Sequence, residues 1–369
     1  MKAWPLFGIA LIQTLLLAAH WFIYCTWIAF WQTLSPRAAL LLGAALLLLA
    51  FSFVPAALLG FFYANRLVTL LYRLAAVWLG FLNYFFWAAC LSWLTSYALT
   101  ALQLHVDKPF IAAAFYSMAV AAGIYGLVNA RILRIRRVSI QLPGLPDAWR
   151  GRTALVLSDL HLGHMNGRGF SRRIVALAMR LNPEIIFFPG DLFDGIRANS
   201  AALIEPFSRL APPLGSYFST GNHDEFGNAA RCAELLSGVG IRALSNEMVT
   251  IDGLQIAGVS YGDSGSPIRL RAILESLHLD PGKASILLNH VPSRLPIVEQ
   301  AGISLQISGH THSGQLFPFT FFTRRAFGNF TYGLQRFGGL QVYTSSGAGS
   351  WGPPMRLGTC PEVVLFTFE

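Results

Sequence analysis

The sequence contains little charge and little cysteine. Charged residues make up 12% of the 369 residues, whereas a soluble domain usually carries about 25%. Four cysteines in a chain of this length, without paired spacing, exclude a disulfide framework. The shortage of polar residues also excludes a disordered chain, a collagen repeat and a coiled coil. The chain is instead 54% hydrophobic, with a formal net charge of +9.

The charges that are present are concentrated after residue 130. Residues 1–130 contain six, at Lys2, Arg37, Arg66, Arg73, Asp107 and Lys108. The uncharged stretches among them each exceed the roughly 20 apolar residues that cross a bilayer as a helix. We predict a transmembrane domain over 1–133, with four helices near 6–30, 39–63, 76–100 and 110–130. Buried helices of a soluble domain are the alternative, but these would each need a polar face.

The basic residues predict the orientation of these helices. With the N-terminus inside, seven basic residues flank the inner ends and two flank the outer ends, as the positive-inside rule requires. Because the number of helices is even, the rest of the chain follows on the inner side. We therefore expect a multi-pass protein of the inner (cytoplasmic) membrane with a cytoplasmic catalytic domain. With one transmembrane helix more or fewer, the catalytic domain would lie on the opposite side of the membrane.

The composition changes from about residue 150. We predict a basic juxtamembrane linker at 134–150 and a water-soluble domain at 151–369. From 153 to 236, short apolar runs typical of strands alternate with segments in which apolar residues recur at helical spacing. After 236, strand-like runs dominate up to 368. This alternation predicts an α/β fold in which helices cover the sheets.

Acidic, histidine and asparagine residues directly follow five of the predicted strands. Ligand-binding residues collect at the carboxyl ends of strands in layered α/β folds, so we expect these five motifs to converge. Nitrogen and oxygen donors without thiolate favour manganese, iron or zinc. Seven candidate ligands suit two ions that share a carboxylate. The seven are Asp159, His161, Asp191, Asn222, His290, His310 and His312.

At these motifs the chain resembles the calcineurin-like metallophosphoesterases, and in particular a bacterial membrane-attached phosphodiesterase branch. The family pattern is D-x-H, G-D-x-x-D, G-N-H-D/E, a single His and G-H-x-H, and the resemblance covers about 150–369. The extended segments 309–315 and 347–354 point to the bacterial branch. The resemblance implies a four-layer αββα sandwich after the four-helix transmembrane domain. It also implies two divalent metal ions, with manganese as our first expectation and zinc or iron as alternatives.

The resemblance further implies a role for each residue. Asp159, His161 and His312 would hold one ion, Asn222, His290 and His310 the other, and Asp191 would bridge both. His223 would be the catalytic histidine, oriented by Asp194. Gly195 and Asp224 stand where protein phosphatases of the superfamily carry Arg and Glu, which argues against a phosphoprotein substrate. We expect Asp224 to support the site as a helix N-cap.

These features predict a metal-dependent phosphoric ester hydrolase embedded in the membrane. We expect a phosphodiesterase or pyrophosphatase in which hydroxide held by two ions attacks a lipid-linked phosphate, such as a lipid nucleotide. One alternative is an anchored phosphodiesterase for soluble nucleotides. The other is a non-catalytic membrane sensor, but a sensor should have lost ligands and none of the seven is missing.

The expected partners are membrane lipids and the phosphorylated lipid or lipid-nucleotide substrate. Much of the positive charge of the soluble part belongs to the juxtamembrane arginines, so we expect no nucleic acid to bind. No obligate protein partner is expected.

Residues 317–337 combine eight aromatic residues with three arginines and no acidic residue. Such a composition suits the headgroup region of a bilayer. We expect a loop that dips toward the cytoplasmic leaflet beside the metal site. Phe319, Phe321 and Phe322 would guide an acyl chain, while Arg324 and Arg325 hold an anionic head group. The alternative is an ordinary hydrophobic core segment under the last strands.

Overall fold

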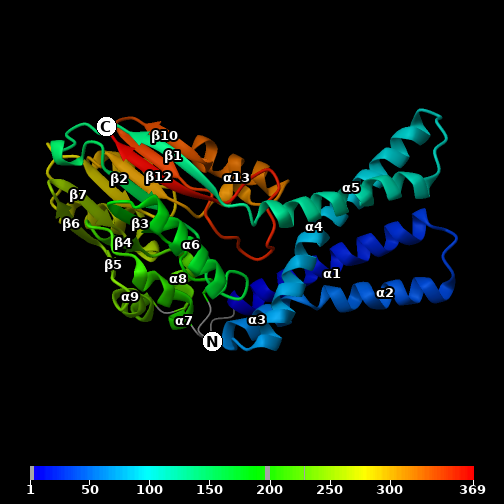
Figure 1. Ribbon diagram of the computed structural model, residues 1–369. Helices are drawn as coiled ribbons and strands as arrows, with labels where there is room; N and C mark the ends of the chain where they lie inside the picture. The colour runs from blue at the N-terminus through cyan, green and yellow to red at the C-terminus, as the bar shows by residue number, and fades with distance from the viewer. Residues whose placement is uncertain (1–3, 196–199, 228) are drawn as a thin grey trace. The chain divides into compact units, whose positions relative to one another are not determined.

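The computed structural model of the protein describes residues 4–195, 200–227 and 229–369, and the chain divides into two compact units (Figure 1). The first unit runs up to Val128 and includes the short segment Gly352–Met355. The second unit contains Asn129–Trp351 and Arg356–Glu369.

The first unit is helical. Its elements are α1 (Trp4–Phe30), α2 (Pro36–Ala50), α3 (Phe53–Phe62), α4 (Arg66–Ala101) and α5 (Lys108–Asn129). In the described part of the chain, four segments are long and apolar enough to span a membrane, with α2 and α3 together forming one of them. The predicted four-helix transmembrane domain is confirmed.

Two of the four predicted helices differ in detail. The second is interrupted between Ala50 and Phe53, just before Pro55, which has no N–H to donate. The third begins ten residues earlier than predicted, because Asn65 caps it by accepting a hydrogen bond from the Val68 N–H at 2.9 Å. At 1.5 Å per residue α4 is roughly 54 Å long, which exceeds the hydrocarbon thickness of about 30 Å. Its first turns, with Arg73, can therefore lie outside the apolar layer.

The second unit contains two six-stranded sheets. The first sheet has the order β1 (Arg134–Ile140), β12 (Glu362–Phe368), β2 (Thr153–Val156), β3 (Ile185–Pro189), β4 (Ser216–Ser219) and β5 (Ile241–Ala243). The second has the order β10 (Gly333–Phe337), β11 (Leu340–Thr344), β9 (Leu305–Ser308), β8 (Ser285–Leu288), β7 (Leu254–Gly258) and β6 (Glu247–Ile251). In each sheet the central strands are parallel, so their carboxyl ends meet at one edge.

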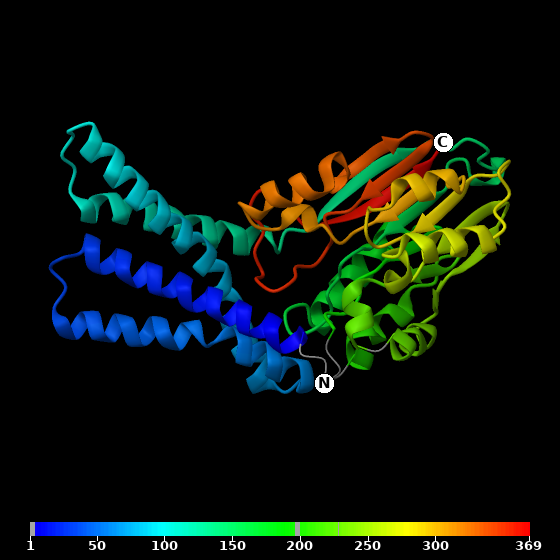
Figure 2. The same ribbon diagram turned by 180° about the vertical axis from the view of Figure 1, so that it is seen from behind.

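Helices cover the outer face of each sheet. The first sheet packs against α6 (Arg168–Leu181), α7 (Ser200–Ile204), η2 (Glu205–Arg209) and α9 (Ala229–Ser237), the green helices of Figure 1. The second packs against α11 (Pro267–Ser276) and α12 (Leu295–Gln300), which face the viewer in Figure 2. Between the sheets lies a core to which both contribute, including Val156, Phe187, Ile286 and Ile307. The predicted four-layer αββα sandwich is confirmed.

Two segments of the second unit differ from the sequence prediction. The expected linker at 134–150 begins with β1, whose seven residues pair in parallel with β12 at the edge of the first sheet. The expected loop in 317–337 is instead the helix α13 (Phe319–Phe327), followed by η4 (Gly328–Thr331) and the strand β10. The arginines of β1 and the mixed basic and aromatic residues of α13 concealed this regular structure.

Candidate metal centre

The five sequence motifs lie in the loops that follow the parallel strands. The first two motifs follow β2 and β3, the third begins α8 (Asn222–Gly227) after β4, and the last two follow β8 and β9. Their side chains form adjoining clusters whose potential ligand atoms all lie within 4.8 Å of one another. The first cluster is Asp159 with His161 and His312, and the second is Asp191 with His290 and His310; a third group, His161 with Asp194 and His223, shares His161 with the first.

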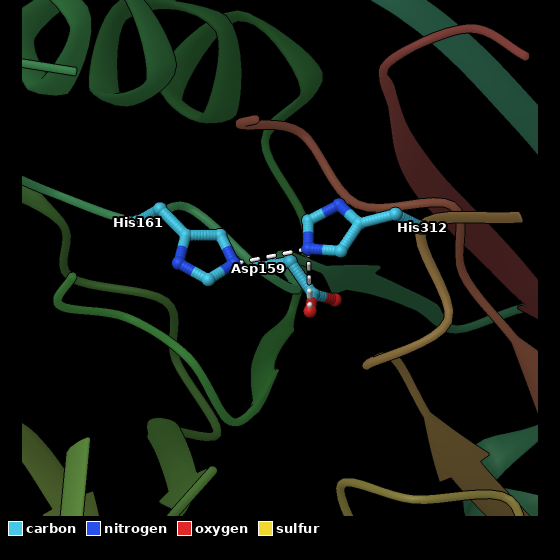
Figure 3. Close-up of side chains that lie close together, drawn as sticks. All are labelled: Asp159, His161 and His312. Carbon is cyan, nitrogen blue, oxygen red and sulfur yellow. Dashed lines mark hydrogen bonds and ion pairs between the residues drawn. The ribbon is translucent and has the colours of Figure 1, made fainter. Parts of the chain in front are cut away.

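In the first cluster, two imidazole rings point their Nε2 atoms at each other. Nε2 of His161 lies 3.0 Å from Nε2 of His312, and the latter lies 3.6 Å from Oδ1 of Asp159. Figure 3 shows both rings directed toward each other beside the carboxylate of Asp159. Two ring nitrogens this close repel each other unless a proton or a cation lies between them. The arrangement therefore fits a metal ion with nitrogen and oxygen ligands.

The second cluster has the same chemistry. Nδ1 of His310 lies 3.0 Å from Oδ1 of Asn222, and Nε2 of His290 lies 3.2 Å from Oδ2 of Asp191. Nδ1 of His290 donates to the carbonyl oxygen of Pro189 at 2.8 Å. Because that carbonyl only accepts, the bond leaves Nε2 of His290 free to act as a ligand.

Asp191 belongs to both clusters. Its Oδ2 atom lies 3.2 Å from Nε2 of His290 and 3.7 Å from Nε2 of His161. Its Oδ1 atom accepts a hydrogen bond from the backbone N–H of His223 at 2.9 Å. This position suits the predicted bridging carboxylate. Burial raises the pKa of Asp191, but the neighbouring histidines, His290 above all, outweigh burial and lower it.

The backbone of the site is strained. Five of the seven predicted ligands have a positive φ: Asp159, His161, Asp191, His310 and His312, with values from 45° to 68°. Residues other than glycine rarely adopt this region, and strain of this kind gathers at functional sites. A Cβ at Gly221 would collide with Oδ1 of Asp191, and a Cβ at Gly309 with Oδ2 of Asp159. Gly221 and Gly309, in the third and fifth motifs, therefore let the carboxylates of Asp191 and Asp159 lie close to the backbone at these two positions.

The side chains of the site carry opposed charges of their own. Burial lowers the pKa of His290, but the charge of Asp191 outweighs this and raises it to about 10. Burial, together with the charge of His290, lowers the pKa of His310 to about 4. At neutral pH His310 is thus a neutral ligand, whereas His290 must lose a proton before it can bind a metal ion.

Asp194 lies between two histidines. Its Oδ1 atom is 3.4 Å from Nδ1 of His161 and 3.7 Å from Nδ1 of His223. The rings of His161 and His223 meet edge to face at 4.8 Å. The structure therefore brings the predicted catalytic pair beside the first cluster, and it places Asp194 close to a predicted ligand as well as to His223.

Two buried residues support the site in ways that the sequence analysis missed. The carboxylate of Asp224, which is not the cap of α8, accepts from the backbone N–H groups of Asp191, Phe193 and Gly221 at 2.7–3.0 Å. It thus joins the second motif to the third. Arg356 donates to the carbonyl oxygen and to Nδ1 of His312 at 3.0 and 3.1 Å. A lone charged residue soon after Pro353-Pro354 was the signal available for Arg356.

The predicted substrate residues lie outside this cluster. α13, all of which the structure describes, buries none of its side chains. Phe319, Phe321 and Phe322 are 52%, 66% and 56% exposed, and Arg324 and Arg325 are exposed too. Phe330 and Phe337, by contrast, pack against the core of the second sheet. The core interpretation is therefore wrong for the first part of 317–337 and correct for these two residues.

Comparison with known proteins agrees with this geometry. The family profile of the calcineurin-like phosphoesterases matches residues 152–314. An uncharacterized metallophosphoesterase of Aquifex aeolicus is 31% identical over 68% of this chain and 98% of its own length. A transmembrane protein with a metallophosphoesterase domain from Danio rerio is 34% identical over 65% of this chain. This chain spans 58% of the length of that relative.

Among solved structures, a dimetal phosphatase from Danio rerio overlaps 54% of this chain and 88% of its own, with 11% identity and a TM-score of 0.38. The sequence relatives, the motifs and the two sheets agree on one assignment. The chain belongs to the calcineurin-like metallophosphoesterase family, and its clustered side chains are candidate ligands for two divalent metal ions.

Proposed function

We propose that the protein is a phosphodiesterase or pyrophosphatase that acts on a lipid-linked phosphate, such as a lipid nucleotide, at the cytoplasmic face of the inner membrane. The observation that carries this proposal is the set of exposed phenylalanines on α13, a helix attached to the last metal motif. Membrane lipids are the proposed partners of that helix.

α13 is joined closely to the metal motif. Gly314, two residues after His312, has a φ of +84°, and a Cβ there would collide with the backbone of Thr320 on α13. The hydroxyl of Thr311 donates to the carbonyl oxygen of Thr331 at 2.8 Å. At the other end of the helix, the ring of Phe327 lies 6.2 Å from that of His310. A lipid bound along α13 would therefore lie beside the ligands.

The exposed face of α13 suits a membrane surface. Phe319, Phe321 and Phe322 present their rings to the surroundings next to two arginines. Large exposed apolar side chains in a group mark a binding or membrane site, and aromatic with basic residues suit the headgroup region. The phenylalanines would contact acyl chains, while Arg324 and Arg325 attract the anionic head group.

The side chains of the site divide the chemistry between them. Two divalent ions, when bound, make water nucleophilic at neutral pH and neutralise the charge on phosphoryl oxygens. His223 donates a proton to the leaving oxygen, and Asp194 orients the imidazole from 3.7 Å. The mixed nitrogen and oxygen donors support manganese as the resident metal, with zinc or iron as alternatives.

The full-length protein with Mn²⁺, in mixed micelles and in vesicles, tests this proposal. It is incubated with lipid phosphodiesters, a lipid nucleotide, cyclic nucleotides and bis-p-nitrophenyl phosphate, and the products are identified by mass spectrometry. We expect metal-dependent cleavage of a lipid-linked substrate with a kcat/KM above that of every soluble ester. Preference for soluble nucleotides would favour the anchored alternative, and cleavage of no ester would favour the sensor.

A further inference from the structure

Four aromatic side chains lie next to histidines of the metal centre, two beside His223 and two beside His310. The ring of His223 meets that of Phe226 at 5.6 Å and that of Trp351 at 5.8 Å, both edge to face. On the other side, the ring of Tyr261 lies 6.2 Å from His290 and 6.4 Å from His310. Phe327 lies 6.2 Å from His310. We call Phe226 and Trp351 the acid-side pair and Tyr261 and Phe327 the far-side pair.

The acid-side pair is exposed although it is apolar. Phe226 is 62% and Trp351 54% exposed, so neither ring serves the core. The backbone of Trp351 is nonetheless fixed: its N–H donates to Oε1 of Gln315 at 3.0 Å, and Nε2 of Gln315 donates to its carbonyl oxygen at 2.9 Å. Gln315 is itself buried and belongs to the segment that follows His312. The last metal motif therefore holds an exposed indole beside His223.

Phe226 lies over Gly195, the position at which the sequence departs from the protein phosphatase pattern. Gly195 has a φ of +73°, and a Cβ there would lie 3.4 Å from the carbonyl oxygen of His223 and 3.7 Å from Cβ of Phe226. A side chain other than hydrogen is strained at this φ. The wall beside His223 is therefore an aromatic ring rather than a basic side chain.

The far-side pair is held in the same manner. The backbone N–H of Tyr261 donates to the hydroxyl of Thr220 at 3.0 Å, and that hydroxyl donates to Oε1 of Glu225 at 2.7 Å. Thr220 directly precedes the third metal motif. Phe327 is positioned by α13, which packs on the last motif. Each of the two sides thus has an aromatic residue whose backbone is fixed by a residue next to a metal motif.

The geometry points to a substrate with a flat or apolar group on each side of its phosphorus, that is, a phosphodiester or a diester of pyrophosphate. This inference rests on the proposed function. The proton donor must lie within hydrogen-bond reach of the leaving oxygen, so the leaving group contacts the acid-side pair. The retained group then contacts the far-side pair. A phosphomonoester has no second carbon substituent and would leave one of the two pairs unused.

Two soluble diesters test this assignment without involving the membrane. Methyl p-nitrophenyl phosphate and phenyl p-nitrophenyl phosphate share the leaving group p-nitrophenolate and differ only in the retained group. Phe226→Ala and Trp351→Ala should raise KM for both esters by the same factor, about fivefold for a lost aromatic contact. Tyr261→Ala and Phe327→Ala should abolish the preference of the natural protein for the phenyl over the methyl ester.

Ile268→Ala, at an 83%-exposed apolar position on α11, is the matched control and should alter neither KM. Metal content and melting temperature are measured for every variant, so that a folding defect is recognised. If all four aromatic variants change the KM values of both esters by the same factor, or change neither KM value, the assignment of two sides is wrong while the proposed function stands. If the natural protein cleaves a lipid phosphodiester but neither of these esters, the assignment of two sides is wrong while the proposed function stands. If it cleaves none of the three, both fail.

Discussion

Nη2 of Arg356 lies 3.1 Å from Nδ1 of His312, and both side chains are buried. A guanidinium only donates hydrogen bonds, so Nδ1 of His312 must act as the acceptor and carries no proton. Burial and the charge of Arg356 accordingly hold the pKa of His312 well below its usual range. The neutral ring therefore carries its single proton on Nε2, the atom that lies 3.0 Å from Nε2 of His161.

Replacing Arg356 should weaken the site without touching a ligand. Arg356→Met removes four hydrogen bonds, to His312, Gly347 and Gly349. The carbonyl oxygens of His312 and Gly347 keep backbone donors, and we expect a loss of about 2 kcal/mol or more in unfolding free energy. Affinity for one of the two ions should fall about 10–100-fold. Calorimetric titration of metal-free protein with Mn²⁺ measures this affinity. Arg356→Lys should lose less affinity than Arg356→Met.

Arg294→Met is a suitable control, because Arg294 also donates to a backbone carbonyl, that of Gly265 at 3.3 Å, but is exposed. Unchanged affinity for both ions in Arg356→Met would show that the contact with His312 has no part in metal binding.

His223→Ala should separate catalysis from metal binding. Both ions should remain, while turnover of esters with alkoxide leaving groups falls about 10²–10⁴-fold. Esters of p-nitrophenol should be spared, because p-nitrophenolate leaves without protonation. Equal losses on both kinds of ester, with both metals present, would mean that His223 stabilises charge rather than donating a proton.

Metal binding should release protons at neutral pH. The pKa of His290 is raised to about 10 in the metal-free protein, so the ring is protonated at pH 7.5 and must lose that proton to become a ligand. The apparent affinity should therefore increase at least about tenfold per pH unit between pH 7 and 9. Calorimetry in buffers of different ionisation enthalpy counts the protons, and a value of zero would contradict the paired state of His290 and Asp191.

The exposed phenylalanines of α13 should matter only for lipid substrates. Changing Phe319, Phe321 and Phe322 to serine should reduce activity on a lipid phosphodiester in vesicles about tenfold or more. Activity on a soluble ester should be nearly unaffected, and Ile268→Ser provides the control for an exposed apolar residue elsewhere. Equal loss on both substrates together with a lower melting temperature would assign the helix a structural role.

The central strands and the site could be predicted because their signals are local. β3, β8 and β9 are buried throughout, and β2 is buried except at Thr153, so each is a short, largely apolar run that ends within two residues of a motif. Edge strands have no such run. β1 is partly exposed and contains Arg134, Arg136 and Arg137, which made it resemble a linker, and β10 pairs with β11 alone and is half-exposed.

The parts of the site that the sequence did not reveal depend on contacts between distant residues. Arg356 reaches His312 across 44 positions, and Asp224 reaches Asp191 across 33. Neither contact has a spacing that a local pattern detects, because sheet pairing alone brings the partners together. Trp351 similarly becomes a neighbour of His223 only in the folded unit, whereas Phe226 lies three positions from His223 on α8.

We expect Asp191 to bridge two metal ions that are both needed to hydrolyse the ester. The most direct measurement is the metal-to-protein ratio, by elemental analysis, together with turnover of bis-p-nitrophenyl phosphate for the natural protein and Asp191→Asn. We predict two ions and metal-dependent turnover for the natural protein, and for Asp191→Asn at most one ion and nearly complete loss of activity. Two bound ions with normal turnover in Asp191→Asn would contradict the shared carboxylate and the account built on it.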